Sequence, residues 1–318
     1  MYFLNNQNLL EIDDSYHQVF KNPFHVNLAL HEIPRMKDAG DLTDLDVKVC
    51  KLVHKFTFLD KQRIERLLGV EIKDRLESLV NMRVLNKFVL SNGYEDYPKV
   101  HDLDVPDIIK MKNKEVLEKD CYILYCLDMA GKVLLEKYTN LDLESWYTSE
   151  NLIRANAVLK KLILSDFYIN IMENTKQYTC EEFNLGRTFY VNKKPLTNDA
   201  DLTMRLNNHK VNYILLTLRD EDFPQYLRSI SERYEILLTT KSWKKYFFEI
   251  EESPVLLIIC ENTDLALRVG QFISQCTNIE RFRLGVFENI RDIKLSDLGA
   301  FYKIEDDKLK KIKAGSFE

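Results

Sequence analysis

Between residues 44 and 92 the apolar side chains recur at three short helical spacings and then alternate, an order that only a few small folds accommodate. Behind Asp44, an effective N-cap residue, Leu45, Val49 and Val53 repeat at intervals of four. This spacing places the three side chains on one side of a helix. The first element of the segment is therefore predicted to be an amphipathic helix capped by Asp44.

Two further helices are predicted directly afterwards. Asp60 supplies a second N-cap, and Gly69 marks the end of that helix, because glycine readily adopts the left-handed backbone found at helix ends. A third stretch sets Ile72, Leu76 and Leu79 on one face. The segment thus predicts three short helices in close succession.

The helices lead into a predicted β-hairpin with a long connection. Val84–Leu90 alternates like a strand, and Asn92-Gly93 supplies turn chemistry. The next strand-like run is Tyr122–Asp128, so the polar stretch between them is interpreted as a long wing insertion. A helix behind Ala130-Gly131 closes the unit. Three helices and a hairpin form a winged helix, which lays one helix in a DNA groove, and we predict such a domain over residues 44–140.

The charge pattern of this segment favours contact with phosphates. Ten basic and five acidic residues lie between Val47 and Leu90, a balance of +5 in a chain whose formal net charge is −5. A local basic surface gains affinity for DNA because each neutralised phosphate releases counterions. The residues predicted to contact duplex DNA are Lys61, Arg63, Lys73, Arg75, Arg83 and Lys87.

A second interpretation of the same charges stays open. Lys and Arg commonly solvate the polar faces of ordinary helices. Three acids on the third predicted helix, Glu71, Asp74 and Glu77, favour this interpretation, because they would face an anionic groove. In that case the winged helix serves protein contact instead of DNA contact.

The remaining chain is predicted to form an N-terminal arm, residues 1–43, and an α/β domain, residues 141–318. The arm is polar and irregular, and a helix capped by Ser149 joins the halves. In the second half short buried-looking strands alternate with helices, which favours a partly parallel sheet. The predicted strands are Arg187–Val191, Val211–Leu218, Val255–Cys260 and Arg283–Phe287, and the predicted helices are Asp222–Leu238 and Thr263–Cys276. The tail from Lys303 is expected to fray. The fold class is α/β, or α+β overall.

Composition indicates a cytoplasmic protein. The six cysteines are dispersed without a C-x-x-C pair, which favours reduced, buried thiols over disulfides or a zinc site. No apolar run approaches the roughly 20 residues that cross a bilayer, so no membrane contact is expected. The first residues lack the basic and apolar regions of a secretory signal. No cofactor and no metal are predicted.

The order of motifs resembles the replication-relaxation family of plasmids and other bacterial mobile elements. DLDVKVCKLVHKFTFLDKQRIERLLG is similar to the family's apolar helix, short link and glutamine-containing helix, here with Gln62. RLESLVNMRVLNKF is similar to its next segment, although Met82-Arg83 stands where Leu-Gly is usual. YILYCLDMAGKVLL keeps the Ala130-Gly131 pair but lacks the preceding Thr-Pro. In SENLIRANAVLKKLI, Arg154 stands where the family has His.

The resemblance extends over roughly residues 44–290, because SPVLLIICENTDLALRVGQFISQC and FRLGVFENI resemble the family's last strand-helix-strand unit. It implies a duplex-DNA-binding protein that serves replication or conjugative transfer together with other proteins of the same element. It also implies that the second half is a restriction-endonuclease-like core. Winged-helix proteins commonly dimerise on paired half-sites, so a homodimer stays an option, although no heptad seam is visible.

A nuclease core needs an acid on one strand and an acid-x-Lys pair on the next, which together hold a divalent metal. The candidate acids are Asp199 and Asp201. The following strand places Leu216, Thr217 and Leu218 where the paired acid and lysine belong, and these side chains supply no charged metal ligand. The core is therefore predicted to be degenerate.

Other catalytic motifs do not occur in the sequence. There is no phosphate-binding G-x-x-x-x-G-K-[ST] loop, no dinucleotide G-x-G-x-x-G after a strand and no G-x-S-x-G elbow. The leading hypothesis is a non-enzymatic DNA-binding accessory or regulatory protein of a mobile element. The alternatives are a metal-dependent nuclease using Asp199 or Asp201, and a hub or transcriptional regulator whose winged helix contacts proteins.

Overall fold

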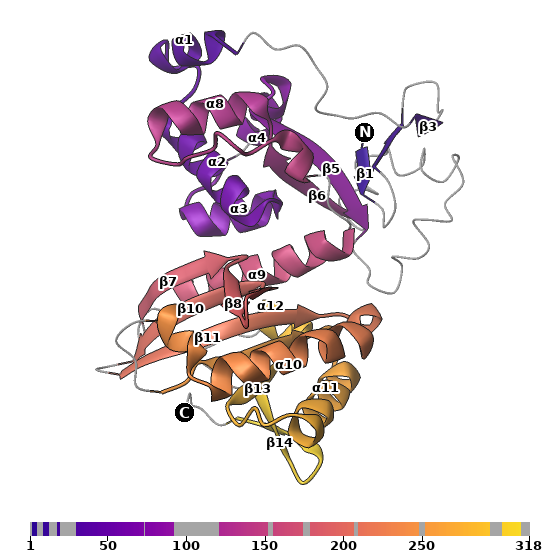
Figure 1. Ribbon diagram of the computed structural model, residues 1–318. Helices are drawn as coiled ribbons and strands as arrows, with labels where there is room; N and C mark the ends of the chain where they lie inside the picture. Colours follow the sequence, from indigo (N-terminus) through magenta and orange to yellow (C-terminus); the bar gives the residue numbers. More distant parts are fainter. Residues whose placement is uncertain are drawn as a thin grey trace. The chain divides into compact units, whose positions relative to one another are not determined.

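The computed structural model contains two compact units, Met1–Leu162 and Ile163–Glu318. The residues it describes are 2–4, 9–12, 18–19, 30–72, 74–91, 121–151, 155–173, 179–206, 209–247, 252–292 and 301–312. Helices accompany sheets whose neighbouring strands are mostly antiparallel, which confirms the α/β class at this level (Figure 1). The predicted turn at Asn92-Gly93 lies outside the described residues.

Unit 1 is built from short helices around a mixed sheet. Its helices are α1 (Glu32–Asp38), α2 (Asp44–Phe56), α3 (Lys61–Leu68), α4 (Arg75–Asn81) and α8 (Met129–Tyr138). Its strands are β1 (Tyr2–Leu4), β2 (Leu9–Ile12), β3 (Gln18–Val19), β4 (Leu59–Asp60), β5 (Leu85–Ser91) and β6 (Cys121–Leu127). The sheet order is β3-β2-β1-β5-β6-β4, and β1 runs parallel to β5. Residues 2–4, 9–12 and 18–19 of the predicted arm are therefore not irregular, because they are strands of this sheet.

Helix starts in unit 1 follow local capping chemistry. The expected cap of α2, Asp44, is wrong by one residue: Thr43 accepts from the Asp46 N–H, and Asp46 in turn accepts from the Thr43 N–H. This reciprocal capping box satisfies two backbone donors that would otherwise lack partners. The expected ends of α3 are confirmed, since Asp60 accepts from the Arg63 N–H and Gly69 adopts φ 69°.

The core of unit 1 depends on a glycine at the start of α8. Val49, Val53, Ile64 and Leu134 are fully buried between the helices and the sheet. A Cβ at Gly131 would lie 2.3 Å from the backbone oxygen of Val84 and 2.6 Å from Leu127. Only a glycine allows α8 to approach the strands this closely. This contact explains why Gly follows Ala130 at this point of the sequence.

Unit 2 is a seven-stranded sheet covered by helices. Its sheet order is β15-β14-β13-β12-β11-β10-β7, and a separate hairpin pairs β8 with β9. The strands are β7 (Thr179–Leu185), β8 (Thr188–Val191), β9 (Lys194–Thr197), β10 (Ala200–Leu206), β11 (His209–Leu218), β12 (Val255–Cys260), β13 (Phe282–Val286), β14 (Phe301–Glu305) and β15 (Lys308–Lys311). The longer helices are α9 (Ala155–Glu173, which begins in unit 1), α10 (Gln225–Thr239) and α11 (Thr263–Cys276); α12 is Phe287–Asp292.

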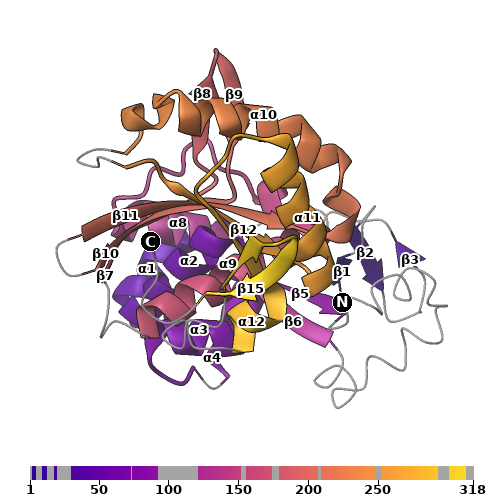
Figure 2. The same cartoon turned by 90° about the horizontal axis from the view of Figure 1, so that it is seen from below.

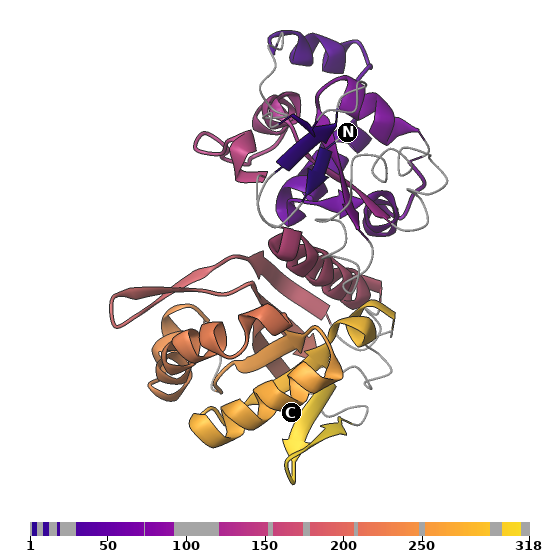
Figure 3. The same cartoon turned by 90° about the vertical axis from the view of Figure 1, so that its right-hand side faces the viewer.

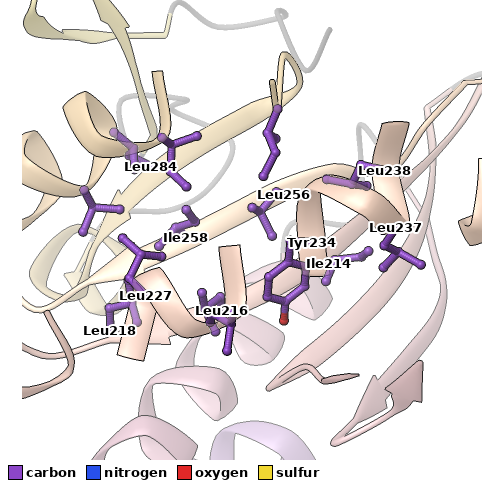
Figure 4. Packing of buried hydrophobic residues seen from close by; sticks show 14 of the residues in the cluster. Ile214, Leu216, Leu218, Leu227, Tyr234, Leu237, Leu238, Leu256, Ile258 and Leu284 are labelled. Atoms are coloured by element: carbon purple, nitrogen blue, oxygen red, sulfur yellow. The ribbon is translucent and has the colours of Figure 1, made fainter. Parts of the chain in front are cut away.

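Strands β11, β12 and β13 are parallel, and their neighbours on both sides are antiparallel. This confirms the partly parallel sheet. The crossover helices α10 and α11 lie on the same face, where α10 packs beside the β8–β9 hairpin (Figure 2). Ile214, Leu216 and Leu218 alternate along β11 and point toward Leu227 and Tyr234 of α10 (Figure 4). The apolar residues at every second position of β11 thus pack against apolar residues that recur at helical spacing on α10.

Two predictions for the second half are wrong. The tail does not fray at Lys303: β14 and β15 form a hairpin beside α11 (Figure 3), turning at Asp306 and Asp307 with φ 52° and 56°. Gly270 of α11 permits this approach, since a Cβ there would lie 2.5 Å from the Ile304 side chain. Ser149 does not begin a long helix but lies in a short 3-10 turn, and α9 is described from Ala155.

In the part of the chain that the structure describes, no helix has both the length and the apolar character needed to span a bilayer.

We expect Gly131→Ala to lower the free energy of unfolding by about 3 kcal/mol, the upper range for overpacked cores. The added methyl group meets a backbone oxygen, which cannot move aside as a side chain can. Urea unfolding followed by circular dichroism measures the change. Gly285→Ala is the matched control, because its nearest contact would be an ordinary 3.5 Å. Equal stability of the two variants would contradict the close approach.

Candidate nucleic-acid interface

The guanidinium group of Arg63 is enclosed by its own unit. Arg63 is 7% exposed, and its Nη1 donates to the Asp60 carboxylate that caps the same helix. A side chain in this position cannot reach a phosphate without breaking this ion pair. Arg63 is therefore engaged within the unit, and its contact with DNA stays a prediction. Helical spacing places Arg63 toward the core beside Ile64, and the adjacent carboxylate compensates its charge.

Arg75 joins α4 to the start of α2. Its Nε donates to Asp46 Oδ1 at 2.8 Å and its Nη2 to Oδ2 at 2.6 Å, while the Asp46 side chain is 0% exposed. Burial alone would raise the pKa of Asp46, but hydrogen bonds from Arg75 and Thr43 outweigh it and hold that pKa below its usual range. Arg75 thus ties α4 to the start of α2, and its predicted contact with DNA stays a prediction.

Arg83 pairs with the residue that caps α8. Its Nε lies 2.8 Å from Asp128 Oδ2, and the Asp128 side chain is 0% exposed. Burial raises the pKa of Asp128 to about 6, although the Met129 N–H and Arg83 act in the opposite direction. Arg83 itself adopts φ 59° in the tight turn between α4 and β5. Arg83 therefore makes a contact within the unit, and its predicted contact with DNA stays a prediction.

The lysines of the predicted set remain more accessible. Lys61 Nζ lies 3.8 Å from Glu65, and half of its side chain is exposed. Lys87 Nζ lies 2.8 Å from Glu77, which also accepts from the Tyr125 hydroxyl at 3.2 Å. Lys73 lies outside the described residues. The structure therefore does not gather the six predicted side chains on one open surface.

The exposed face of α4 and of the turn before it is acidic. Asp74 and Glu77 are exposed, and Asn81 extends the same polar face. Glu77 holds Lys87 of the neighbouring strand, so its charge is partly neutralised within the unit. A helix with these side chains offers no direct match to the phosphates of a DNA groove.

An open cationic surface lies on α2 instead. A pocket of about 510 Å³ is lined by Lys48, Lys51, Leu52, His54, Lys55, Leu67, Leu68 and Leu141. The three lysines recur at i, i+3 and i+7, which places them on one side of the helix. These lysines contribute to the positive charge balance of the segment, but no site was predicted for them. Their helical spacing around Leu52 is the sequence signal that could have indicated this surface.

The acids weighed for a nuclease are engaged by donors of unit 2. Asp201 is 1% exposed and accepts from Asn184 at 3.0 Å, Arg187 at 3.2 Å and Asn198 at 3.3 Å. Asp199 accepts from the N–H and hydroxyl of Thr217 at 2.6 and 2.7 Å. Within the described ranges no group of three or more His, Cys, Asp or Glu side chains is placed to hold a metal ion. Both carboxylates act as structural acceptors.

Comparison of the chain with family models, curated proteins and solved structures returned no match.

Replacing Arg75 by Ala should lower the free energy of unfolding by about 2–3 kcal/mol, because the buried Asp46 loses its counter-charge and Arg75 is partly solvated. Urea unfolding measures this loss. Lys61→Ala, which removes an exposed cation, should change it by less than about 0.5 kcal/mol. A combined Arg75→Ala/Asp46→Asn variant should lose less than the sum of its single variants. Strict additivity would show that the pair is not coupled.

The raised pKa of Asp128 predicts a pH dependence. Its contribution to stability is fully present below its ordinary pKa of about 4 and is lost as pH rises through about 6. Asn cannot ionise, so the free energy of unfolding of wild type minus that of Asp128→Asn should fall between these pH values. Denaturant titrations across this range measure the difference. If this difference instead rises with pH, the conclusion that burial raises the pKa of Asp128 is contradicted.

Proposed function

We propose that residues 44–138 form a winged-helix module with which the chain binds duplex DNA without catalysing a reaction. The order α2–β4–α3–α4–β5–β6 supports this proposal, together with the pairing of β4 to β6 through Leu59↔Tyr125. A short strand after the first helix that joins the later hairpin is the arrangement in which winged helices present α4 and the hairpin. This arrangement of elements is the observation that carries the proposal.

The proposed contact depends on phosphate neutralisation and not on arginine forks. Lys61 lies at the first turn of α3, and Lys87 lies on β5. The Lys61 side chain is 50% exposed and the Lys87 side chain is 34% exposed and paired with the exposed Glu77, whereas Arg63, Arg75 and Arg83 are paired with less exposed carboxylates. Lysine contacts of this kind fix a protein on the duplex but carry little sequence information. We propose a positioning role for Lys61 and Lys87.

The role in a mobile element comes from the sequence resemblance alone. On that proposal the protein is a cytoplasmic accessory or regulatory factor in replication or conjugative transfer, and a homodimer would match paired half-sites. The partners would be proteins of the same element. Unit 2 would serve as a scaffold with a restriction-endonuclease-like core, and its two central carboxylates would stabilise that core through Asn184, Asn198 and Thr217.

A protein-binding winged helix is the second candidate. The acidic outer face of α4, with Asp74 and Glu77, favours it, because like charges repel a phosphate backbone. On this alternative α4 would face a basic surface of another protein, and duplex DNA would not bind.

Fluorescence anisotropy with a labelled duplex of about 20 base pairs at several salt concentrations tests the DNA proposal. Lys61→Ala and Lys87→Ala should each reduce the slope of log affinity against log salt by about 1. Lys137→Ala, an exposed lysine on α8, is the matched control and should leave the slope unchanged. Absence of any binding at low salt would reject the DNA proposal in favour of protein contact.

A further inference from the structure

The pocket on α2 is lined by both leucines and lysines. Its leucines, Leu52 of α2, Leu67 and Leu68 of α3, and Leu141, are each partly exposed, and we call them its floor. Its lysines are Lys48, Lys51 and Lys55, and we call them its edge. We call this combination the lysine–leucine pocket. Its volume of about 510 Å³ lies in the range of ligand and peptide sites.

The edge of the lysine–leucine pocket has positive charge available for a partner. Lys48 and Lys51 are exposed and form no ion pair with any residue that the structure describes. The acid one turn before Lys48 is Asp44, and its carboxylate is bonded to Lys37 at 2.8 Å. Asp46, two residues before Lys48, is buried and paired with Arg75. Lys48 and Lys51 therefore do not serve to balance these acids.

The floor adds apolar surface and no competing charge. His54 contacts the ring of Trp146 at a centroid distance of 5.9 Å. Burial lowers the pKa of His54, while Glu150 acts weakly in the opposite direction, so the imidazole is neutral near pH 7. A ligand must therefore supply apolar groups for the leucines and negative groups for the lysines.

We propose that the lysine–leucine pocket docks an acidic amphipathic helix of a partner protein. Leucine-type side chains at i, i+3 and i+4 of that helix would fill the floor, as in other helix-in-groove complexes. Glu or Asp side chains beside this apolar stripe would pair with Lys48 and Lys51, which lie about one turn apart on α2. Electrostatic complementarity would select the partner and the apolar contacts would retain it.

The leucines favour a helix over nucleic acid at this place. A phosphate backbone satisfies lysines but offers no aliphatic side chain that would remove Leu52, Leu67 and Leu68 from water. The inference goes beyond the proposed DNA contact, because it uses none of the side chains assigned to that contact. DNA binding through the pocket is accordingly an outcome that the experiment must distinguish.

The test measures binding of a fluorescein-labelled acidic peptide to the full chain by anisotropy. The peptide has about 14 residues, with Leu at i, i+3, i+4 and i+7 and Glu on the flanking positions. A scrambled peptide of equal composition and charge lacks the apolar stripe. We expect the patterned peptide to bind at least about 10-fold more tightly than the scrambled one, a difference of about 1.4 kcal/mol.

Charge reversal in the protein identifies the site. Lys48→Glu/Lys51→Glu should lower the affinity for the acidic peptide at least about 10-fold. Lys137→Glu, which makes the same change on another exposed helix of unit 1, should leave its affinity within about 2-fold. A peptide with Lys in place of every Glu should bind the doubly reversed variant better than wild type. This rescue shows that the variant is folded and that opposite charges meet.

Three results would overturn the proposal: equal affinity for patterned and scrambled peptides, unchanged affinity of the acidic peptide for Lys48→Glu/Lys51→Glu, or failure of the Lys-containing peptide to prefer that variant. A loss of duplex binding in Lys48→Glu/Lys51→Glu, without a change in peptide binding, would assign the pocket to DNA. Failure of the DNA proposal would appear in duplex binding by the wild type and by the Lys61 and Lys87 variants, and it would leave peptide binding intact.

Discussion

Unit 1 depends on buried aspartates that are paired with arginines. A carboxylate withdrawn from water costs several kcal/mol unless a counter-charge and hydrogen bonds compensate it. Asp46 illustrates the arrangement, because one carboxylate closes the capping box of α2 and accepts two hydrogen bonds from Arg75 of α4. The pair thereby links two helices whose paired residues lie 29 positions apart in the chain. Asp60 and Asp128 are the N-cap residues of α3 and α8, and they are paired with Arg63 and Arg83.

In the three pairs the cation is an arginine, whereas Lys48 and Lys51 are exposed. Arginine presents a planar fork that matches a carboxylate with two hydrogen bonds and is more weakly hydrated than an ammonium group. It therefore suits the positions beside the buried Asp46 and Asp128. At Lys48 and Lys51, hydration favours the compact charge of an ammonium group. Counting Lys and Arg together gives the balance of +5 but hides this division. The surface charge available to a partner is carried by lysines, including Lys48 and Lys51.

Local signals in the sequence sufficed where an element is defined by its own residues. The helix between Asp60 and Gly69, the strand Val255–Cys260 and the helix Thr263–Cys276 all agree with their expected limits. The C-terminal hairpin did not follow from local signals, because its strands are rich in lysine and its turn uses two aspartates at positive φ. Its stabilisation comes from α11, where Gly270 allows close approach.

Local sequence signals predicted even less of the candidate site. Asp46 and Arg75 lie 29 residues apart, so no helical spacing could reveal their pairing, and each looked like a surface residue. In contrast, Lys48, Lys51 and Lys55 were visible as a helical stripe, yet the leucines that complete the pocket come from α3 and from Leu141. The basic segment as a whole is visible in the sequence. Which of its cations are accessible follows only from the folded structure.

The carboxylates of unit 2 extend this reasoning to the nuclease alternative. A hard divalent ion requires carboxylate oxygens whose lone pairs face the ion. Asp201 directs its oxygens to Asn184, Asn198 and Arg187, and Asp199 directs one oxygen to the N–H and hydroxyl of Thr217. These contacts tie the base of the β8–β9 hairpin and the edge strands to β11. Recruitment of either carboxylate by a metal would leave buried donors without partners, at a cost of about 1–3 kcal/mol each. The geometry therefore assigns both aspartates to the architecture of the sheet, which is why binding, and not metal-dependent hydrolysis at these two residues, is the activity we propose for this chain.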